Sequence, residues 1–177
     1  MNSQEALAAV NLVPQKTPDY TFHKLILYEA VLLTQAKRVL ETGTDVGDSA
    51  RIFATALRRT NGVLFTIDRK TDLDLSWMVE YPNVMAIRGD SLQIPDDSPW
   101  KDGLDVLYID SEHTKEQVLA LADDAYCEVH RGYVGNMTYT IKGKNRRLSL
   151  TRFTEEKAWQ CAHDRLAGKE PMLGEMV

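Results

Sequence analysis

The chain has 177 residues, of which 44% are hydrophobic and 27% are charged, so we expect one folded domain over 1–177 and not a disordered chain. A net charge of −5 argues against a nucleic-acid partner held by charge alone, and no apolar run reaches the length of a membrane span. The two cysteines show no CxxC spacing, and the first residues lack a secretion signal, so a cytoplasmic location is expected.

The N-terminal half predicts helices and strands in alternation. Residues 1–19 form an extension that contains a short helix at 3–10. Apolar residues then recur at helical spacing over 20–37. A strand begins at 38–40, a helix follows at 49–59, and the next strand covers 63–67.

The second half continues this alternation. We expect strands at 84–87, 105–109 and 132–136, and helices at 71–80, 114–130 and 151–166. One further short strand fits within 171–177. Strands joined by helices predict an α/β fold, with a doubly wound and mostly parallel sheet covered by helices on both faces.

An acidic residue follows each of the first four predicted strands. These residues are Glu41, Asp68, Asp90 and Asp110. Ligands of such sheets bind at the carboxyl ends of the strands, so the four acids predict a binding site at one rim.

The turn after the first strand is rich in glycine. Gly43 and Gly47 lack the Cβ atoms that would keep a nucleoside cofactor away from the backbone. Asp68 comes 21 residues after Gly47, which is where nucleotide-binding sheets place an acid on a ribose hydroxyl.

Four motifs resemble those of the class I S-adenosylmethionine-dependent methyltransferases, in particular the small O-methyltransferase-like branch. The resemblance covers about residues 24–160, and it implies the strand order 3-2-1-4-5. The most specific motif is the last of the four, which are Val39-Leu40-Glu41-Thr42-Gly43-Thr44, Ile67-Asp68, Gly89-Asp90-Ser91 and Leu107-Tyr108-Ile109-Asp110-Ser111-Glu112-His113-Thr114.

The resemblance implies a role for each matching residue. Asp110 and His113 would be catalytic, with His113 as a base. The residues that would bind S-adenosylmethionine are Glu41, Gly43, Thr44, Gly47, Ser49, Asp68, Arg69, Asp90, Ser91 and Asp110.

The chain departs from the family pattern at three places. Asp45 replaces the middle glycine of the loop. The resemblance allows a divalent metal at Asp110, but the end of the fifth predicted strand offers Asn136 and Thr138 and no carboxylate, so the metal is disfavoured and no residue is assigned to it. Only 11 residues follow Leu166, which leaves room for one closing edge strand and favours a homo-oligomer that covers the exposed edge.

The resemblance therefore implies methyl transfer from S-adenosylmethionine to a small-molecule oxygen nucleophile, or less favourably to nitrogen. Charge and hydropathy predict no nucleic-acid or membrane partner. Two alternatives stay open. One is an oxidoreductase that uses a nicotinamide dinucleotide, and the other is a non-catalytic cofactor-binding or scaffold protein. The basic run at 142–147 is either a solvated loop or a clamp for an anionic substrate.

Overall fold

The computed structural model describes residues 3–11, 18–93, 97–100, 103–111, 138–141 and 160–169. Its centre is a sheet of five strands in the order β3-β2-β1-β4-β5. The strands are β1 (Arg38–Thr42), β2 (Val63–Asp68), β3 (Val84–Arg88), β4 (Val106–Ile109) and β5 (Thr138–Ile141).

The first four strands are parallel, and β5 runs antiparallel to β4. The expected strand order and the mostly parallel sheet are thus confirmed. The position expected for the fifth strand was 132–136, which lies outside the described residues, and the strand found beside β4 is Thr138–Ile141 instead.

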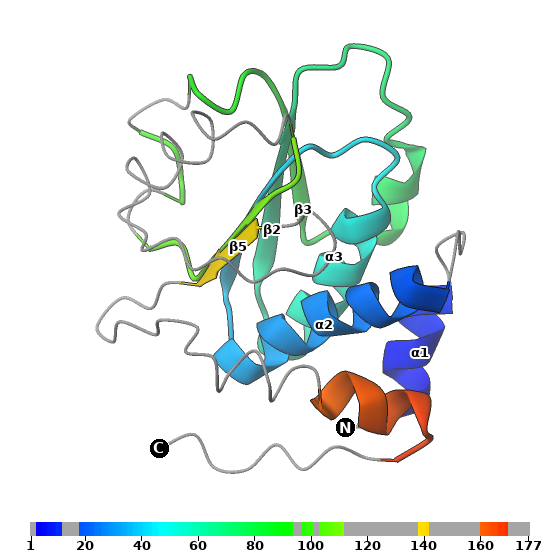
Figure 1. The fold of residues 1–177 in the computed structure, drawn as a ribbon. Coiled ribbons are helices and arrows are strands. Elements are labelled where there is room, and N and C mark those ends of the chain that lie inside the picture. Colours follow the sequence, from blue (N-terminus) through cyan, green and yellow to red (C-terminus); the bar gives the residue numbers. More distant parts are fainter. Residues whose placement is uncertain are drawn as a thin grey trace.

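One face of the sheet is covered by α2 (Pro18–Thr34) and α3 (Asp48–Thr60), with α1 (Ser3–Asn11) packed beside them (Figure 1). Every residue of α2 from 24 to 33 is buried, because this helix lies between the sheet and other helices. Figure 1 also shows the C-terminal helical segment at 160–166 near α1 and α2. A buried ion pair between Arg165 and Glu29 joins that segment to α2.

The strands place alternate side chains on the two faces. Val39, Leu64 and Val106 belong to the core under the helices. Their neighbours in the sequence belong to a second cluster on the opposite face, which contains Leu40, Phe65, Ile67, Trp100, Leu104, Leu107 and Ile109. The helix expected at 114–130 lies outside the described residues.

The helix expected at 71–80 is shorter in the structure. Only the 3-10 helix η1 (Ser76–Glu80) forms there, and it buries Trp77. Among the helices that the structure describes, none combines the length and the apolar character needed to span a bilayer.

Parallel register brings the strand ends to one rim of the sheet. Thr42 at the end of β1 is paired with Ile67 on β2 and with Ile109 on β4. The segments that follow these three strands therefore meet above the same edge, where the sequence predicts a site.

Candidate functional site

The loop between β1 and α3 has an unusual backbone. Gly43 and Gly47 have φ angles of +94° and +80°, which glycine adopts at little cost. Asp45 has φ of +43° and also lies in the left-handed region, where aspartate is tolerated better than most residues. The loop thus forms although Asp45 replaces a glycine of the family pattern.

The two glycines allow close packing inside the protein. An added Cβ at Gly43 would lie 2.3 Å from the carbonyl oxygen of Asp110, and one at Gly47 would lie 2.5 Å from the Trp77 ring. Gly43 therefore holds the end of β1 against the segment after β4. Gly47 makes room for Trp77, so its immediate neighbour is this ring and not the cavity.

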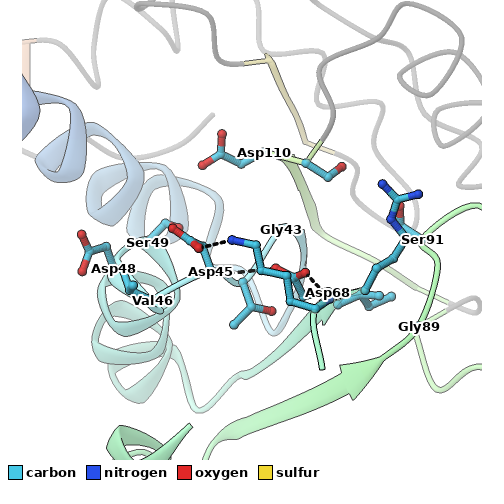
Figure 2. Close-up of a pocket in the computed structure, with 14 residues that line it drawn as sticks. Gly43, Asp45, Val46, Asp48, Ser49, Asp68, Gly89, Ser91 and Asp110 are labelled. Atoms are coloured by element: carbon cyan, nitrogen blue, oxygen red, sulfur yellow. Dashed lines mark hydrogen bonds and ion pairs between the residues drawn. The ribbon is translucent and has the colours of Figure 1, made fainter. Parts of the chain in front are cut away.

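A cavity of about 620 Å³ lies at this rim (Figure 2). In Figure 2, Ser49 lies at the start of α3, Ser91 lies on the opposite side, and Asp68 and Asp110 lie between them. The lining residues are Gly43, Thr44, Asp45, Val46, Asp48, Ser49, Ile67, Asp68, Arg69, Lys70, Gly89, Ser91, Asp110 and Ser111.

Most of the predicted cofactor residues line this cavity. They are Gly43, Thr44, Ser49, Asp68, Arg69, Ser91 and Asp110. Glu41, Gly47 and Asp90 are not among the lining residues, and His113 lies outside the described residues. The carboxylate of Asp90 instead accepts the backbone N–H of Leu92 at 2.9 Å, which fixes a turn.

Asp68 is held at the end of β2 by backbone donors. One carboxylate oxygen accepts the N–H of Asp45 at 2.9 Å, and the other accepts the N–H of Lys70 at 2.9 Å. Each carboxylate oxygen has two lone pairs, so both keep the capacity to accept a further hydrogen bond from a ligand hydroxyl. This geometry suits the ribose-binding role that the sequence predicts for Asp68.

An ion pair joins the glycine loop to the segment after β2. Lys70 Nζ lies 2.5 Å from Asp45 Oδ1, and both side chains are more than half exposed. The hydrogen bond to Asp45 is the largest cause that raises the pKa of Lys70. The carboxylate that replaces the family glycine is thus neutralised at the rim of the cavity.

Glu41 lies behind the cavity wall and is fully buried. Its carboxylate accepts Ser49 Oγ at 2.5 Å and Thr66 Oγ1 at 2.6 Å. Thr66 Oγ1 in turn lies 2.7 Å from Thr44 Oγ1. The pKa of Glu41 is raised to about 7, mainly by burial and also by the charge of Asp110, while the two hydroxyl donors and Lys24 act to lower it.

A second carboxylate near the cavity, besides that of Glu41, belongs to Asp48 in the first turn of α3. Asp48 is 8% exposed, lines the cavity, and lies 3.7 Å from Nζ of Lys24, which α2 supplies from the interior. Asp48, Asp45 and Lys70 are not among the site residues predicted from the sequence. Their position directly beside the predicted Gly47, Thr44 and Arg69 is the signal that would have found them.

Asp110 lies at the end of β4, and its backbone N–H donates to Thr42 at 2.8 Å. The hydroxyl of Tyr108 donates to its carboxylate at 3.3 Å. Ser111 lines the cavity next to it and lies 3.0 Å from the hydroxyl of Thr42. Within the described residues, no group of three or more His, Cys, Asp and Glu side chains could hold a metal ion.

The chain matches a family model described as a methyltransferase domain over residues 40–132. No curated protein matches the chain.

Among solved structures, the SAH-bound methyltransferase PaMTH1 of Podospora anserina is 14% identical with a TM-score of 0.48, over 80% of this chain and 88% of that one. A Bacillus cereus O-methyltransferase in complex with SAH is 17% identical with a TM-score of 0.44, over 79% and 90% of the two chains. The O-methyltransferase TomG of Streptomyces achromogenes, in complex with SAM, is 17% identical with a TM-score of 0.42, over 80% and 89%.

Proposed function

This chain belongs to the methyltransferase domain family of S-adenosylmethionine-dependent enzymes, and from this membership we propose that it transfers the methyl group to an oxygen atom of a small molecule. The observation that carries the proposal is the cavity at the carboxyl ends of β1, β2 and β4, inside the matched region. Parallel α/β sheets bind their ligands at this rim.

The residues of the cavity fit S-adenosylmethionine. The backbone of Gly43 lines the cavity, and Asp68 offers two oxygens with acceptor capacity to a ribose. Gly89 and Ser91 line the opposite side, where the adenine would lie. A volume of about 620 Å³ falls within the range of small-molecule sites.

S-adenosylmethionine supplies an electrophilic methyl group on a sulfonium, and the protein has to align an acceptor with it. Positioning two reactants in line accounts for a large share of the acceleration in such displacements. Asp110 projects from the end of β4 into the cavity, so in this proposal it positions the acceptor hydroxyl. His113 keeps the role of general base, because an imidazole takes up a proton near neutral pH.

An oxygen acceptor is favoured over nitrogen because a carboxylate and a histidine follow β4 in the sequence. A hydroxyl needs to lose its proton as the new bond forms, and such a pair can accept that proton. A small molecule is favoured over a nucleic acid because the net charge is −5 and Asp45, Asp48, Asp68 and Asp110 line the cavity.

The first experiment is calorimetric titration with S-adenosylmethionine and S-adenosylhomocysteine, with NADH as the control ligand and with or without magnesium. Micromolar binding of both sulfur compounds and no binding of NADH are the expected result. Binding of NADH alone would favour an oxidoreductase. Failure of all three ligands to bind would overturn the proposal.

The second experiment identifies the acceptor atom. The protein is incubated with methyl-labelled S-adenosylmethionine and a panel of phenols, catechols, hydroxy acids and amines, and products are assigned by mass spectrometry and NMR. Label on oxygen is expected, and label on nitrogen alone would contradict the oxygen assignment. Cofactor binding without any methylated product in a broad panel would favour a non-catalytic binding protein.

A further inference from the structure

Glu41 connects two hydroxyl groups of the cavity wall to one buried carboxylate. Ser49 Oγ donates to one carboxylate oxygen at 2.5 Å, and Thr66 Oγ1 donates to the other at 2.6 Å. Thr66 has one hydroxyl proton, so at the 2.7 Å contact between the two threonines Thr44 is the donor and Thr66 the acceptor. Ser49 and Thr44 both line the cavity.

The direction of these bonds fixes how the wall meets a ligand. While Glu41 is ionised, the hydroxyl protons of Ser49 and Thr44 point toward the interior. Each hydroxyl then turns only lone pairs toward the cavity, so each can accept a hydrogen bond and neither can donate one.

A proton on Glu41 changes this arrangement. If the carboxyl proton lies toward Ser49, the Ser49 hydroxyl turns and can donate into the cavity. If it lies toward Thr66, the chain reverses and the Thr44 hydroxyl can donate instead. One donor therefore faces the cavity whichever carboxylate oxygen carries the proton.

The amino-acid end of the proposed cofactor carries a carboxylate, which needs hydrogen-bond donors. Ser49 lies in the first turn of α3, whose N-terminus favours negative charge. Asp48 lies in the same turn, but Lys24 is 3.7 Å from its carboxylate and balances its charge. A ligand carboxylate at this turn would meet the lone pairs of Ser49 if Glu41 stayed ionised.

We propose, on the basis of the proposed function, that Glu41 is a positioning residue for the cofactor carboxylate. Protonation of Glu41 turns the hydroxyl of Ser49 or Thr44 into a hydrogen-bond donor for that carboxylate. Cofactor binding therefore takes up one proton from solvent. Charged or polar groups from four elements face Glu41. They are Lys24 on α2, Asp110 after β4, and the hydroxyls on β2 and α3. Burial already brings the pKa of Glu41 to about 7, so the proton is exchanged near neutral pH.

Calorimetry with S-adenosylhomocysteine tests this inference directly. Titrations in buffers with different ionisation enthalpies give the number of protons taken up, which should be about 0.9 per site near pH 8. The dissociation constant should rise about tenfold between about pH 6 and pH 8, because free Glu41 loses its proton over this interval. A decarboxylated analogue, which keeps the amino group, should bind without proton uptake.

Glu41→Gln separates positioning from a purely structural role. The neutral amide donates to one hydroxyl and accepts from the other, as protonated Glu41 does. The variant should therefore bind S-adenosylhomocysteine with the same affinity at pH 6 and pH 8, and about tenfold more tightly than the unchanged protein at pH 8. Glu80→Gln, which removes one carboxylate on η1 outside the cavity, should keep the original pH profile.

The opposite results overturn the inference in recognisable ways. Binding of S-adenosylhomocysteine without proton uptake, or with equal uptake for the decarboxylated analogue, would exclude the proposed link. So would weaker binding of Glu41→Gln at every pH. If that variant does not fold, proton counting with the two ligands on the unchanged protein still decides. No binding of S-adenosylhomocysteine at any pH would overturn the proposed function itself and this inference with it.

Discussion

The backbone of Gly43 lies so close to Asp110 that an added Cβ would be 2.3 Å from the Asp110 carbonyl oxygen. This contact joins the loop after β1 to the segment after β4, and the N–H of Asp110 donates to Thr42 beside it. Two segments about 67 residues apart in the sequence thus form one wall of the cavity.

Gly43→Ala should destabilise the protein by more than about 2 kcal/mol, because it combines a strained positive φ with a clash against backbone. Urea unfolding measures this change. Gly89→Ala is the matched control, since Gly89 also lines the cavity but has no atom within 4 Å of an added Cβ. Equal stability of the two variants would contradict the close contact.

Asp68→Asn should weaken binding of S-adenosylhomocysteine at least about tenfold. The amide keeps one acceptor oxygen, whereas the carboxylate accepts two backbone N–H groups and has capacity left for a ribose. Calorimetry provides the measurement.

The control for this prediction is Asp105→Asn. Asp105 also accepts two backbone N–H groups, those of Lys37 and Arg38, but it does so at the amino end of β1. Its replacement should leave the affinity unchanged. Equal losses of affinity in both variants would show a general effect on folding and not a binding role for Asp68.

Lys70→Met should leave the melting temperature unchanged, because its ion pair with Asp45 is more than half exposed. The ratio of the affinity for S-adenosylmethionine to that for S-adenosylhomocysteine should be about two- to fivefold higher in the variant than in the unchanged protein. The reason is that the lost cation no longer opposes the positive charge of the sulfonium. Comparative calorimetry at low and high salt tests this, and the effect should shrink at high salt. An unchanged ratio, equal to that of Lys37→Met at the amino end of β1, would place Lys70 too far from the sulfonium to matter.

The stability of the protein should depend on pH through Glu41. Its pKa is raised from 4.5 to about 7 in the folded state, so folding favours the protonated form. This contribution is fully present below about pH 4.5 and is lost as the pH rises through about 7. The free energy of unfolding of Glu41→Gln, relative to that of the unchanged protein, should therefore rise by up to about 3 kcal/mol between pH 4.5 and pH 8. Urea unfolding across this range is the test, and a pH-independent difference would show that Glu41 is not the titrating group.

The alternation of strands and helices determined the parallel sheet and the rim at which the ligand site forms, whereas the strand order was implied by the family resemblance. The reason is local, because apolar runs that end at glycine or an acid specify where each strand stops. Once the strands are parallel, their carboxyl ends must meet. The acids after β2 and β4, Asp68 and Asp110, therefore lie together at the cavity.

Tertiary structure decided which side chains of the rim reach the cavity. Glu41 has the same orientation along β1 as Val39, toward the helices, so it is buried against Ser49 and Thr66. The ion pair of Asp45 and Lys70 depends on two loops that only the sheet brings together. The antiparallel pairing of β5 with β4 also depends on long-range contacts. The sequence alone thus determined where the site forms, and packing determined which residues form its wall, because side-chain direction and loop contacts are set by the assembled fold.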